Sequence, residues 1–244
     1  MSGHSHAKTV KRVKDANDAK RGKIFSKMAR LISIAAKDGA DLETNSKLKQ
    51  AIEVAKSVNT PKDNIERAIK KGVGGDESEQ LEEVSYEAIG PGGVSLILDG
   101  ITDNKNRTLS EIRQVLLKNN SKLADEGSQK WAFGQKGVIT IQIEKDDRVN
   151  NEESLELVAI EAGAEDIHVR EYDEEKYVEI TTKPEDLEQV KQQITDQGIK
   201  IEATSLDWVA NEKLEVDARA RQACEKLFDE LDDNEAIQSI YSNL

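Results

Sequence analysis

The chain has few of the residues that build disulfide frameworks, membrane spans or aromatic binding surfaces. Its 244 residues include one cysteine, Cys224, and 4% are aromatic. One cysteine cannot form a disulfide or a thiolate zinc site within a single chain. No apolar run approaches the roughly 18–20 residues that a membrane helix needs, and the polar, basic N-terminus has no apolar segment typical of a signal peptide. We therefore expect a cytoplasmic protein with no membrane span.

Acidic residues dominate the chain as a whole but not its first third. The formal net charge is −13. Residues 1–72 hold 17 Lys and Arg against 8 Asp and Glu, which gives +9, whereas residues 73–244 hold 18 against 40, which gives −22. A polyanion would therefore be attracted to the first part of the chain and repelled by the rest.

Residues 1–75 are expected to form a basic N-terminal arm and a three-helix domain. The arm has almost no large apolar side chains, which is typical of a segment that becomes ordered on a partner. Apolar residues recur at helical spacing from Lys20 to about Lys37, and a second helix follows. The third helix is predicted to have Thr60 as its N-cap, Pro61 at its first position and Gly72 at its end.

Beyond a Gly-rich and acidic linker, the apolar pattern changes to that of strands. From Gly137 the predicted order β-α-β-β-α-β is that of a ferredoxin-like unit. The middle segment lacks a complete fold by itself, so we expect the last helix and strand to return and complete it. The fold class is therefore α+β, with an N-terminal three-helix bundle and two α/β domains of ferredoxin-like type. The predicted domains are 1–75, 80–135 together with 210–244, and 136–209.

A basic face on the first helix is the strongest candidate for contact with a partner. At about 100° per residue, five cations between Lys20 and Lys37 fall within an arc of roughly 100° beside the apolar arc. Several cations at a helical rise suit a phosphate backbone because they displace condensed counterions together. A solvated helix face usually explains such a run, but here the arm is basic too and the rest of the chain is acidic. The predicted nucleic-acid contacts are Lys8, Lys11, Arg12, Lys14, Lys20, Arg21, Lys23, Lys27 and Arg30.

The sequence has few side chains or motifs that could recognise nucleic-acid bases. Phe25 is the only aromatic residue among the first 72 and lies in the apolar arc of its helix. We therefore expect Phe25 in the core, which leaves no stacking platform for single strands. No zinc finger, helix-turn-helix or RNP pattern is found. Recognition of backbone and shape is expected rather than sequence reading.

The sequence shows no pattern typical of an enzyme's catalytic residues or of a cofactor site. His4 and His6 have no thiol or carboxylate partner nearby, so no metal site is predicted. Cys224 lies on the apolar face of the last helix, which favours a buried structural thiol. The common nucleophile, zincin and P-loop motifs do not occur. We expect a binding protein without cofactor, metal or small-molecule substrate, and favour a monomer.

Two polar or Gly-rich segments leave alternatives open. Gly90–Gly93 could cradle a phosphate, although a tight hairpin explains it better. The segment Asp103–Thr108 ends a strand and starts a helix, which suits helix capping. Its side chains also suit a secondary contact site, formed by Asn104, Asn106 and Arg107.

Long motifs along the whole chain resemble the YebC/PmpR family. Asp18–Lys27 resembles the family's opening signature, and Pro61–Gly72 matches its third helix. The segments Gly90–Val94, Thr102–Thr108 and Tyr241–Asn243 fit its later motifs. The resemblance implies a helical bundle and two α/β domains, with the C-terminus folding back into the middle domain.

The same resemblance implies a function in gene expression. Family members are described as probable transcriptional regulators that bind DNA. Some look instead like translation factors that act on the ribosome near the peptidyl-transferase centre and relieve stalling at proline-rich sequences. The family's N-terminal tip usually reads Gly-His-Ser-Lys-Trp, whereas this chain has Gly3–Ala7 with His and Ala in place of Lys and Trp. We predict a DNA-binding transcriptional regulator, with a ribosome-associated translation factor that binds ribosomal RNA as the alternative.

Overall fold

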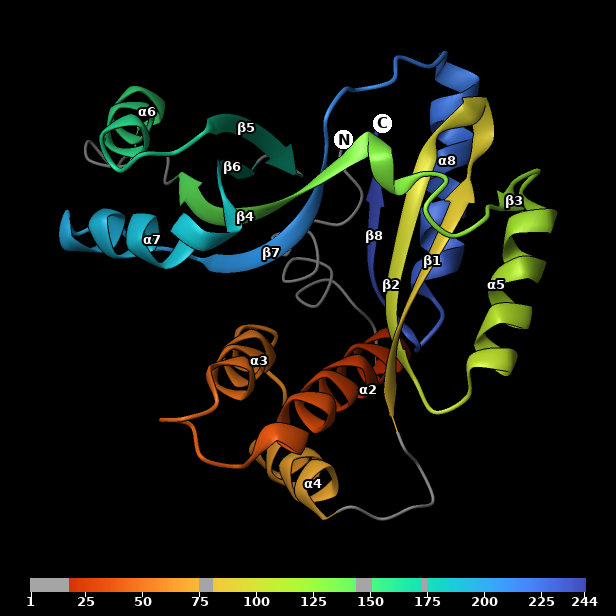
Figure 1. Cartoon of the computed structure of the whole chain (residues 1–244), viewed down its shortest axis with the longest axis horizontal. Coiled ribbons are helices and arrows are strands. Elements are labelled where there is room, and N and C mark those ends of the chain that lie inside the picture. The colour runs from red at the N-terminus through yellow and green to blue at the C-terminus, as the bar shows by residue number, and fades with distance from the viewer. Residues whose placement is uncertain (1–17, 75–80, 144–150, 173–174) are drawn as a thin grey trace. The chain divides into compact units, whose positions relative to one another are not determined.

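Apolar stripes on three helices build the N-terminal bundle. The computed structural model describes residues 18–74, 81–143, 151–172 and 175–244. Helices α2 (Asp18–Ala35), α3 (Ser46–Ser57) and α4 (Lys62–Val73) pack around one core (Figure 1), and a short 3-10 turn, Ala36–Asp38, extends α2. Their helical spacing places one stripe of each helix inside, as predicted. The core residues include Met28, Ile32, Ala35, Leu48, Ile52, Ala55, Val58 and Ile65.

The two predicted ends of the third helix are wrong. Pro61, not Thr60, is the N-cap of α4, with an extended backbone at φ −57° and ψ 140°. The Thr60 hydroxyl makes no capping bond and is buried without a hydrogen-bond partner in the described part of the chain. At the other end α4 continues through Gly72 to Val73, and Gly74 is the C-cap.

Gly72 instead allows α4 to pack closely on α2. A Cβ at this position would collide with the carbonyl oxygen of Ser33 and would lie 2.7 Å from the Cβ of Ala36. The neighbouring contact is also close, because the Ser33 hydroxyl donates a 2.9 Å hydrogen bond to the Ala68 carbonyl. The glycine is therefore required by helix packing and not by the end of the helix.

Replacing Gly72 with alanine is expected to lower the free energy of unfolding by about 1–2 kcal/mol. Alanine favours a helix, but here the cost of overpacking against α2 backbone exceeds that gain. Urea denaturation followed by circular dichroism measures the change. At Gly22 no described atom lies within 4 Å of an added Cβ, so Gly22→Ala is the matched control. A loss of stability in both variants would argue against the packing explanation.

The middle sheet is completed by the end of the chain. Strand β8 pairs antiparallel with β2, with Leu98 opposite Ile240, so the predicted return of the C-terminal helix and strand is confirmed. The strand order is β3-β1-β2-β8, and α5 and α8 pack on one face of this sheet. The elements are β1 (Glu82–Ile89), β2 (Ser95–Thr102), α5 (Lys105–Lys118), β3 (Lys122–Leu123), α8 (Ala218–Asp232) and β8 (Ile237–Ser242).

The Gly-rich segment is a hairpin turn, as favoured from the sequence. It joins β1 and β2 through a 3-10 turn at Pro91–Gly93, in which Gly92 and Gly93 have φ angles of 72° and 83°. Left-handed angles of this kind favour glycine. Cys224 is buried beneath the turn, and its Sγ lies 3.4 Å from the Pro91 carbonyl oxygen. Burial raises the pKa of the Cys224 thiol, which agrees with a structural role.

The third domain has the predicted ferredoxin-like order. Its sheet runs β5-β6-β4-β7, and α6 and α7 cover one face. Strand β7 starts at Ala203, and Ile199 packs into the core before the strand begins. The elements are β4 (Phe133–Ile143), α6 (Glu152–Glu161), β5 (Asp166–Tyr172), β6 (Glu175–Thr182), α7 (Leu187–Asp196) and β7 (Ala203–Ala210).

The chain divides into two compact units. One contains the helical bundle and the middle domain, up to Ala132 and again from Ala210 to Leu244, and the other contains Phe133–Val209. The predicted linker falls mainly on residues 75–80, outside the described residues. The bundle and the middle sheet can therefore be described together, as parts of the first unit.

Candidate nucleic-acid interface

Two lysines of the predicted basic face contact the C-terminal end of α8. The Lys27 Nζ lies 2.8 Å from Oδ1 of Asp232 and donates to the Asp232 carbonyl oxygen at 2.7 Å. The Lys27 side chain is only 10% exposed. One turn earlier, Lys23 forms a 3.0 Å ion pair with Asp233, in which both side chains are more exposed than that of Lys27. The two pairs join the helical bundle to the middle domain.

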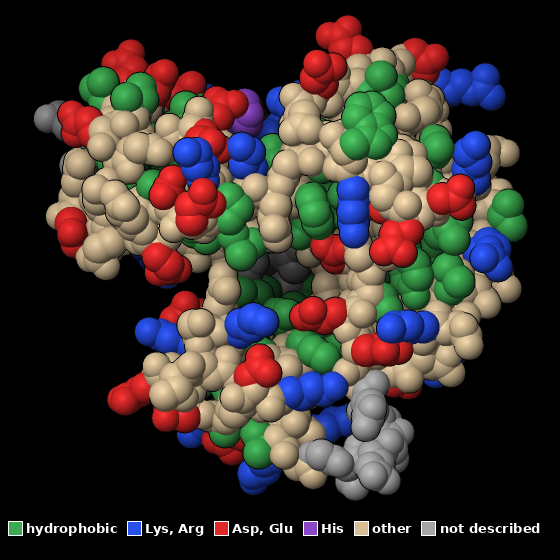
Figure 2. All heavy atoms as spheres, viewed as in Figure 1, with side chains coloured by type: hydrophobic (Ala, Val, Ile, Leu, Met, Phe, Trp, Pro, Cys, Tyr) green, Lys and Arg blue, Asp and Glu red, His purple; other side chains and the backbone are tan. Residues whose placement is uncertain are grey.

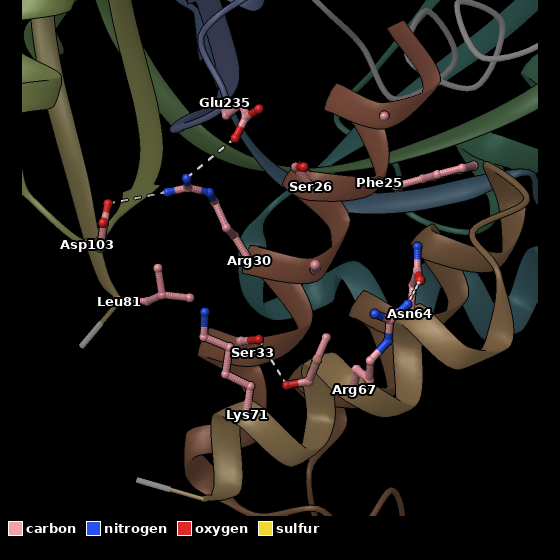
Figure 3. A pocket seen from close by; sticks show the side chains of 13 residues that line it. Phe25, Ser26, Arg30, Ser33, Asn64, Arg67, Lys71, Leu81, Asp103 and Glu235 are labelled. Carbon is pink, nitrogen blue, oxygen red and sulfur yellow. Dashed lines mark hydrogen bonds and ion pairs between the residues drawn. The ribbon is translucent and has the colours of Figure 1, made fainter. Parts of the chain in front are cut away.

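Arg30 continues this contact at the edge of the sheet. Its guanidinium donates to the Ile101 carbonyl at 3.3 Å and lies 3.8 Å from Asp103 and 3.7 Å from Glu235 (Figure 3). Lys37, at the far end of the same face, donates to the Leu81 carbonyl. Four of the five cations in the predicted arc thus have partners within the chain.

Negative charge at the C-terminal end of α8 explains why these cations contact that end of the helix. Its last turn and the residues after it carry acidic side chains and no basic one, at the end where the helix dipole is already negative. The cations of α2 offset that charge. The acidic residues concerned are Asp229, Glu230, Asp232, Asp233 and Glu235.

The other predicted contacts are only partly visible in the structure. Lys8, Lys11, Arg12 and Lys14 lie outside the described residues, as does the side chain of Lys20. Arg21 is exposed at the start of α2. The arc as a phosphate-binding face therefore stays a prediction, and three of its members, Lys23, Lys27 and Arg30, are engaged inside the chain.

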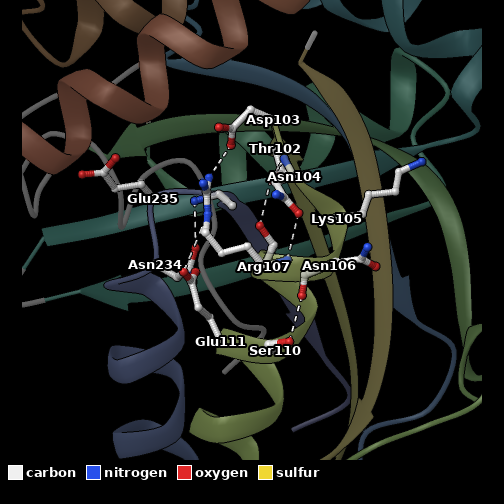
Figure 4. A network of polar contacts seen from close by, with 12 residues as sticks. Thr102, Asp103, Asn104, Lys105, Asn106, Arg107, Ser110, Glu111, Asn234 and Glu235 are labelled. Atoms are coloured by element: carbon white, nitrogen blue, oxygen red, sulfur yellow. Dashed lines mark hydrogen bonds and ion pairs between the residues drawn. The ribbon is translucent and has the colours of Figure 1, made fainter. Parts of the chain in front are cut away.

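The proposed secondary contact site is first of all a helix cap. The Asn104 side chain accepts a 3.0 Å hydrogen bond from the Arg107 backbone N–H, and Thr102 Oγ1 accepts from the Asn104 N–H at 2.9 Å (Figure 4). The Arg107 guanidinium pairs with Asp103. Asn106 is exposed. Capping explains this segment, and its role as a contact for a partner stays a prediction.

Two guanidinium groups, those of Arg30 and Arg107, lie close to the Asp103 carboxylate. Burial by itself would raise the pKa of Asp103, but a backbone hydrogen bond and the guanidinium groups of Arg107 and Arg30 outweigh burial and lower it. The carboxylate is therefore held ionised, which suits its position between two arginines.

A pocket opens between α2 and α4. Its volume is about 530 Å³, and Phe25, Arg30, Asn64, Arg67 and Lys71 are among its lining residues (Figure 3). Phe25 is half-buried and lies outside the apolar core, so the prediction that it packs in the core is wrong. The reason is its position at the edge of the arc, about 100° from Ile24, where the ring is turned away from the bundle centre.

Comparison with known proteins identifies the family. The model of the TACO1/YebC protein N-terminal domain matches residues 5–75, and that of the TACO1/YebC second and third domain matches residues 81–244. The chain belongs to the TACO1/YebC family. The resemblance inferred from the motifs is therefore confirmed.

Relatives match along the whole chain, and a solved structure matches along nearly all of it. The chain is 42% identical over 244 residues to a probable transcriptional regulatory protein of Desulforamulus reducens and 44% identical over 245 residues to one of Caldanaerobacter subterraneus subsp. tengcongensis. Each match covers 100% of this chain and 98% of the relative. The crystal structure of a conserved hypothetical protein from Aquifex aeolicus superposes with a TM-score of 0.82 at 40% identity, over 93% of this chain and 90% of that one.

In this TACO1/YebC chain, α4 carries cations that were not among the predicted contacts. Arg67, Lys70 and Lys71 are exposed, and their spacing places them on one face of the helix. The Arg67 guanidinium bonds to the Asn64 side chain and to the Asp63 carbonyl, which holds it beside the pocket. Figure 2 shows Lys and Arg side chains exposed over this part of the surface. The spacing within Pro61–Gly72 could have revealed them.

The described part of the chain also bears on two alternative kinds of site. None of its helices has the length and apolar character needed to cross a membrane. Within the same residues, no group of three or more His, Cys, Asp or Glu side chains is arranged to hold a metal ion. His4 and His6 lie outside the described residues.

Proposed function

We propose that this chain regulates gene expression by binding nucleic acid through its N-terminal helical domain. The observation that carries the proposal is the uneven charge, +9 over residues 1–72 against −22 over the rest. Relatives along the full chain are named probable transcriptional regulatory proteins, which supports regulation. The proposal is of a binding protein and not of an enzyme.

Duplex DNA is the first proposed target. Exposed cations of the bundle would dock on the phosphates, and the acidic domains would be kept away from the backbone and so set the orientation. Lys23, Lys27 and Arg30 join this contact only if the phosphates displace their acidic partners on the middle domain. The exposed cations in the described bundle include Arg21, Lys47, Lys49, Lys56, Lys62, Arg67, Lys70 and Lys71.

Ribosomal RNA is the second proposed target, and the charge of the remaining chain favours it. A charge of −22 on residues 73–244 would be repelled by long duplex on either side of the binding site. A ribosome offers both RNA phosphates for the bundle and basic proteins for the acidic domains. The protein would then act as a translation factor.

Co-sedimentation with ribosomes distinguishes the two targets. Purified protein is spun with ribosomes at physiological salt, with and without an excess of random duplex DNA. Saturable binding that DNA does not displace would support the translation factor. Ribosome binding lost to competing duplex, or duplex binding alone, would support the DNA-binding regulator. Binding to neither would contradict the proposal.

Replacing Arg67, Lys70 and Lys71 together with glutamine is expected to weaken nucleic-acid binding by at least about tenfold. Each lost phosphate contact also lowers the slope of log affinity against log salt by up to about 0.9. Fluorescence anisotropy with a labelled duplex across a salt series measures both. Arg67 bonds within α4, to Asn64 and Asp63, and the substitutions leave the Lys27–Asp232 ion pair in place.

The matched control replaces three exposed lysines of the third domain with glutamine, namely Lys176, Lys183 and Lys200. The net charge changes equally in both variants, so a general charge effect would weaken binding in both. Equal affinities and salt slopes for the two variants would contradict a role of α4 in phosphate binding.

A further inference from the structure

We propose that the pocket between α2 and α4 accepts one unpaired nucleotide of a single-stranded nucleic acid, with its base stacked on Phe25. The inference rests on the proposed function and deepens it, because it names the form of nucleic acid that this pocket selects, beside the duplex that the exposed cations can bind. A base inside a duplex is stacked on both faces and cannot enter such a pocket without leaving the helix. Four observations support it.

The first observation is the size and chemical character of the pocket. A volume of about 530 Å³ falls within the range of roughly 300–1,000 Å³ that is usual for small-molecule sites. Its lining combines apolar groups, such as Phe25 and Leu81, with the cations Arg30, Arg67 and Lys71. The lining carboxylates, Asp103 and Glu235, both lie beside Arg30. A nucleotide needs this combination, because its base is flat and weakly polar and its phosphate is an anion.

The second observation is the placement of Phe25. An aromatic ring in a small helical bundle would ordinarily be buried in the core, but the core contacts here are made by aliphatic side chains and the ring lines the pocket. Aromatic faces outside the core are what single-strand-binding proteins use to stack bases, largely without regard to sequence. Phe25 is placed for that role.

The third observation is the polar pair on α4. Asn64 and Arg67 come from the first two turns of α4, and they lie on the same side of the pocket as Phe25 in Figure 3. An amide offers both a donor and an acceptor to a base edge, and a guanidinium offers donors to a base or a phosphate. The bond between Asn64 and Arg67 orients both groups before a ligand arrives.

The fourth observation is Gly22, which lies one turn before Phe25 and Ser26 on the pocket side of α2. A glycine inside a helix is destabilising relative to alanine. At Gly72 the close packing of α4 on α2 requires a glycine. At Gly22 no described atom lies within 4 Å of an added Cβ, so packing among the described residues does not require a glycine there. A glycine at the pocket wall allows the backbone of a ligand to approach α2 closely.

Arg30 does not supply the phosphate contact by itself, since Asp103 and Glu235 already engage it within the pocket. We therefore assign the phosphate side to Arg67 on α4, which bonds to a neutral amide and a carbonyl. The ring of Phe25 and the space at Gly22 then select a base that is free to leave the stack. Duplex binding by the exposed cations needs neither.

Fluorescence anisotropy at 0.15 M salt tests the inference on the full chain. The probes are a labelled 12-nucleotide single strand of mixed sequence, as RNA and as DNA, and the duplex of the same DNA. The variants are Phe25→Leu, which keeps apolar volume but removes the aromatic face, and Gly22→Ala. Thermal denaturation of each variant checks its folding.

The wild type is expected to bind the single strand more tightly than the duplex. Phe25→Leu should weaken single-strand binding about tenfold and leave duplex binding unchanged. Gly22→Ala should weaken single-strand binding about fivefold or more while the protein becomes as stable as the wild type or more stable. Loss of binding by a protein of equal or higher stability cannot be attributed to unfolding. A difference between the RNA and DNA strands identifies the preferred sugar.

The binding results distinguish failure of the proposed function from failure of the pocket proposal. If the wild type binds single strand, duplex and ribosomes no better than a control protein, the proposed function itself fails. If the wild type binds nucleic acid but Phe25→Leu and Gly22→Ala bind the single strand like the wild type, only the pocket is wrong. Equal losses on single strand and duplex in both variants would also overturn the pocket.

Discussion

Replacing Glu87 with alanine is expected to lower the free energy of unfolding by about 3 kcal/mol. Glu87 is 3% exposed, and its carboxylate accepts backbone hydrogen bonds from Gly127 at 2.5 Å, Gln129 at 2.5 Å and Lys130 at 3.1 Å. Removing it leaves three N–H groups without their acceptor, and each unsatisfied buried donor costs roughly 1–3 kcal/mol, less where water can reach it. Urea denaturation measures the loss.

The exposed Glu83 on the same strand is the matched control. Glu83→Ala should change the free energy of unfolding by less than about 0.5 kcal/mol, as is usual for surface positions. The turn held by Glu87 also orders Trp131, which is 76% exposed and donates from Nε1 to the Ser128 carbonyl at 2.8 Å. A change in tryptophan fluorescence in Glu87→Ala alone would locate the effect at this turn.

The same carboxylate makes stability depend on pH. Burial by itself would raise the pKa of Glu87, but the three backbone hydrogen bonds and the Lys130 charge outweigh burial and lower it below its ordinary value of about 4.5. The stabilisation is therefore complete above about pH 4.5 and is lost as the pH falls through the lowered pKa of the folded state. Glu87→Gln should remove this part of the acid dependence, and an unchanged slope below pH 4.5 would contradict the assignment.

Replacing Lys27 with methionine is expected to cost about 2–3 kcal/mol and to loosen the helical bundle from the middle domain. The substitution keeps an apolar stem but removes a nearly buried cation that bonds to both the carboxylate and the carbonyl of Asp232. Asp232 then remains beside the negative end of α8 without this cation. Urea denaturation measures the cost, and hydrogen exchange at the end of α8 reports the loosening.

Lys23→Met provides the comparison within the same helix. Its ion pair with Asp233 is exposed, with side chains 42% and 63% accessible, so its loss should cost less than about 1 kcal/mol. High salt should weaken the contribution of Lys23 more than that of Lys27. Equal costs for the two substitutions would show that burial does not distinguish the pairs.

These pairs bear on how the N-terminal domain would bind phosphates. Any nucleic acid that uses Lys23, Lys27 or Arg30 has to compete with carboxylates of the same chain. Arg67 on α4 bonds instead to a neutral amide, that of Asn64, and to the Asp63 carbonyl. The first contacts are therefore expected on α4, and involvement of α2 would follow displacement of the acidic groups.

Local patterns in the sequence determined most of the architecture. The apolar spacing of Ile32, Leu48 and Ile65 predicted three helices around one core, and the alternation along Ile139 and Ile141 predicted the ferredoxin-like domain. These predictions succeed because helical and strand periods reflect which side of an element is buried. The incomplete middle segment also predicted the return of the C-terminal strand, since a sheet of so few strands lacks a sufficient core.

The sequence by itself determined the fold class, the family and the contrast of charge between the first third of the chain and the remainder. The tertiary structure decided which cations remain available, because Lys27 and Asp232 are 205 residues apart and meet only where the C-terminal end of α8 reaches α2. It also decided the position of Phe25, since a residue at the edge of an apolar arc can turn toward the core or away from it. Periodicity constrains the face of a single helix, whereas partners distant in the chain are chosen by packing and electrostatics.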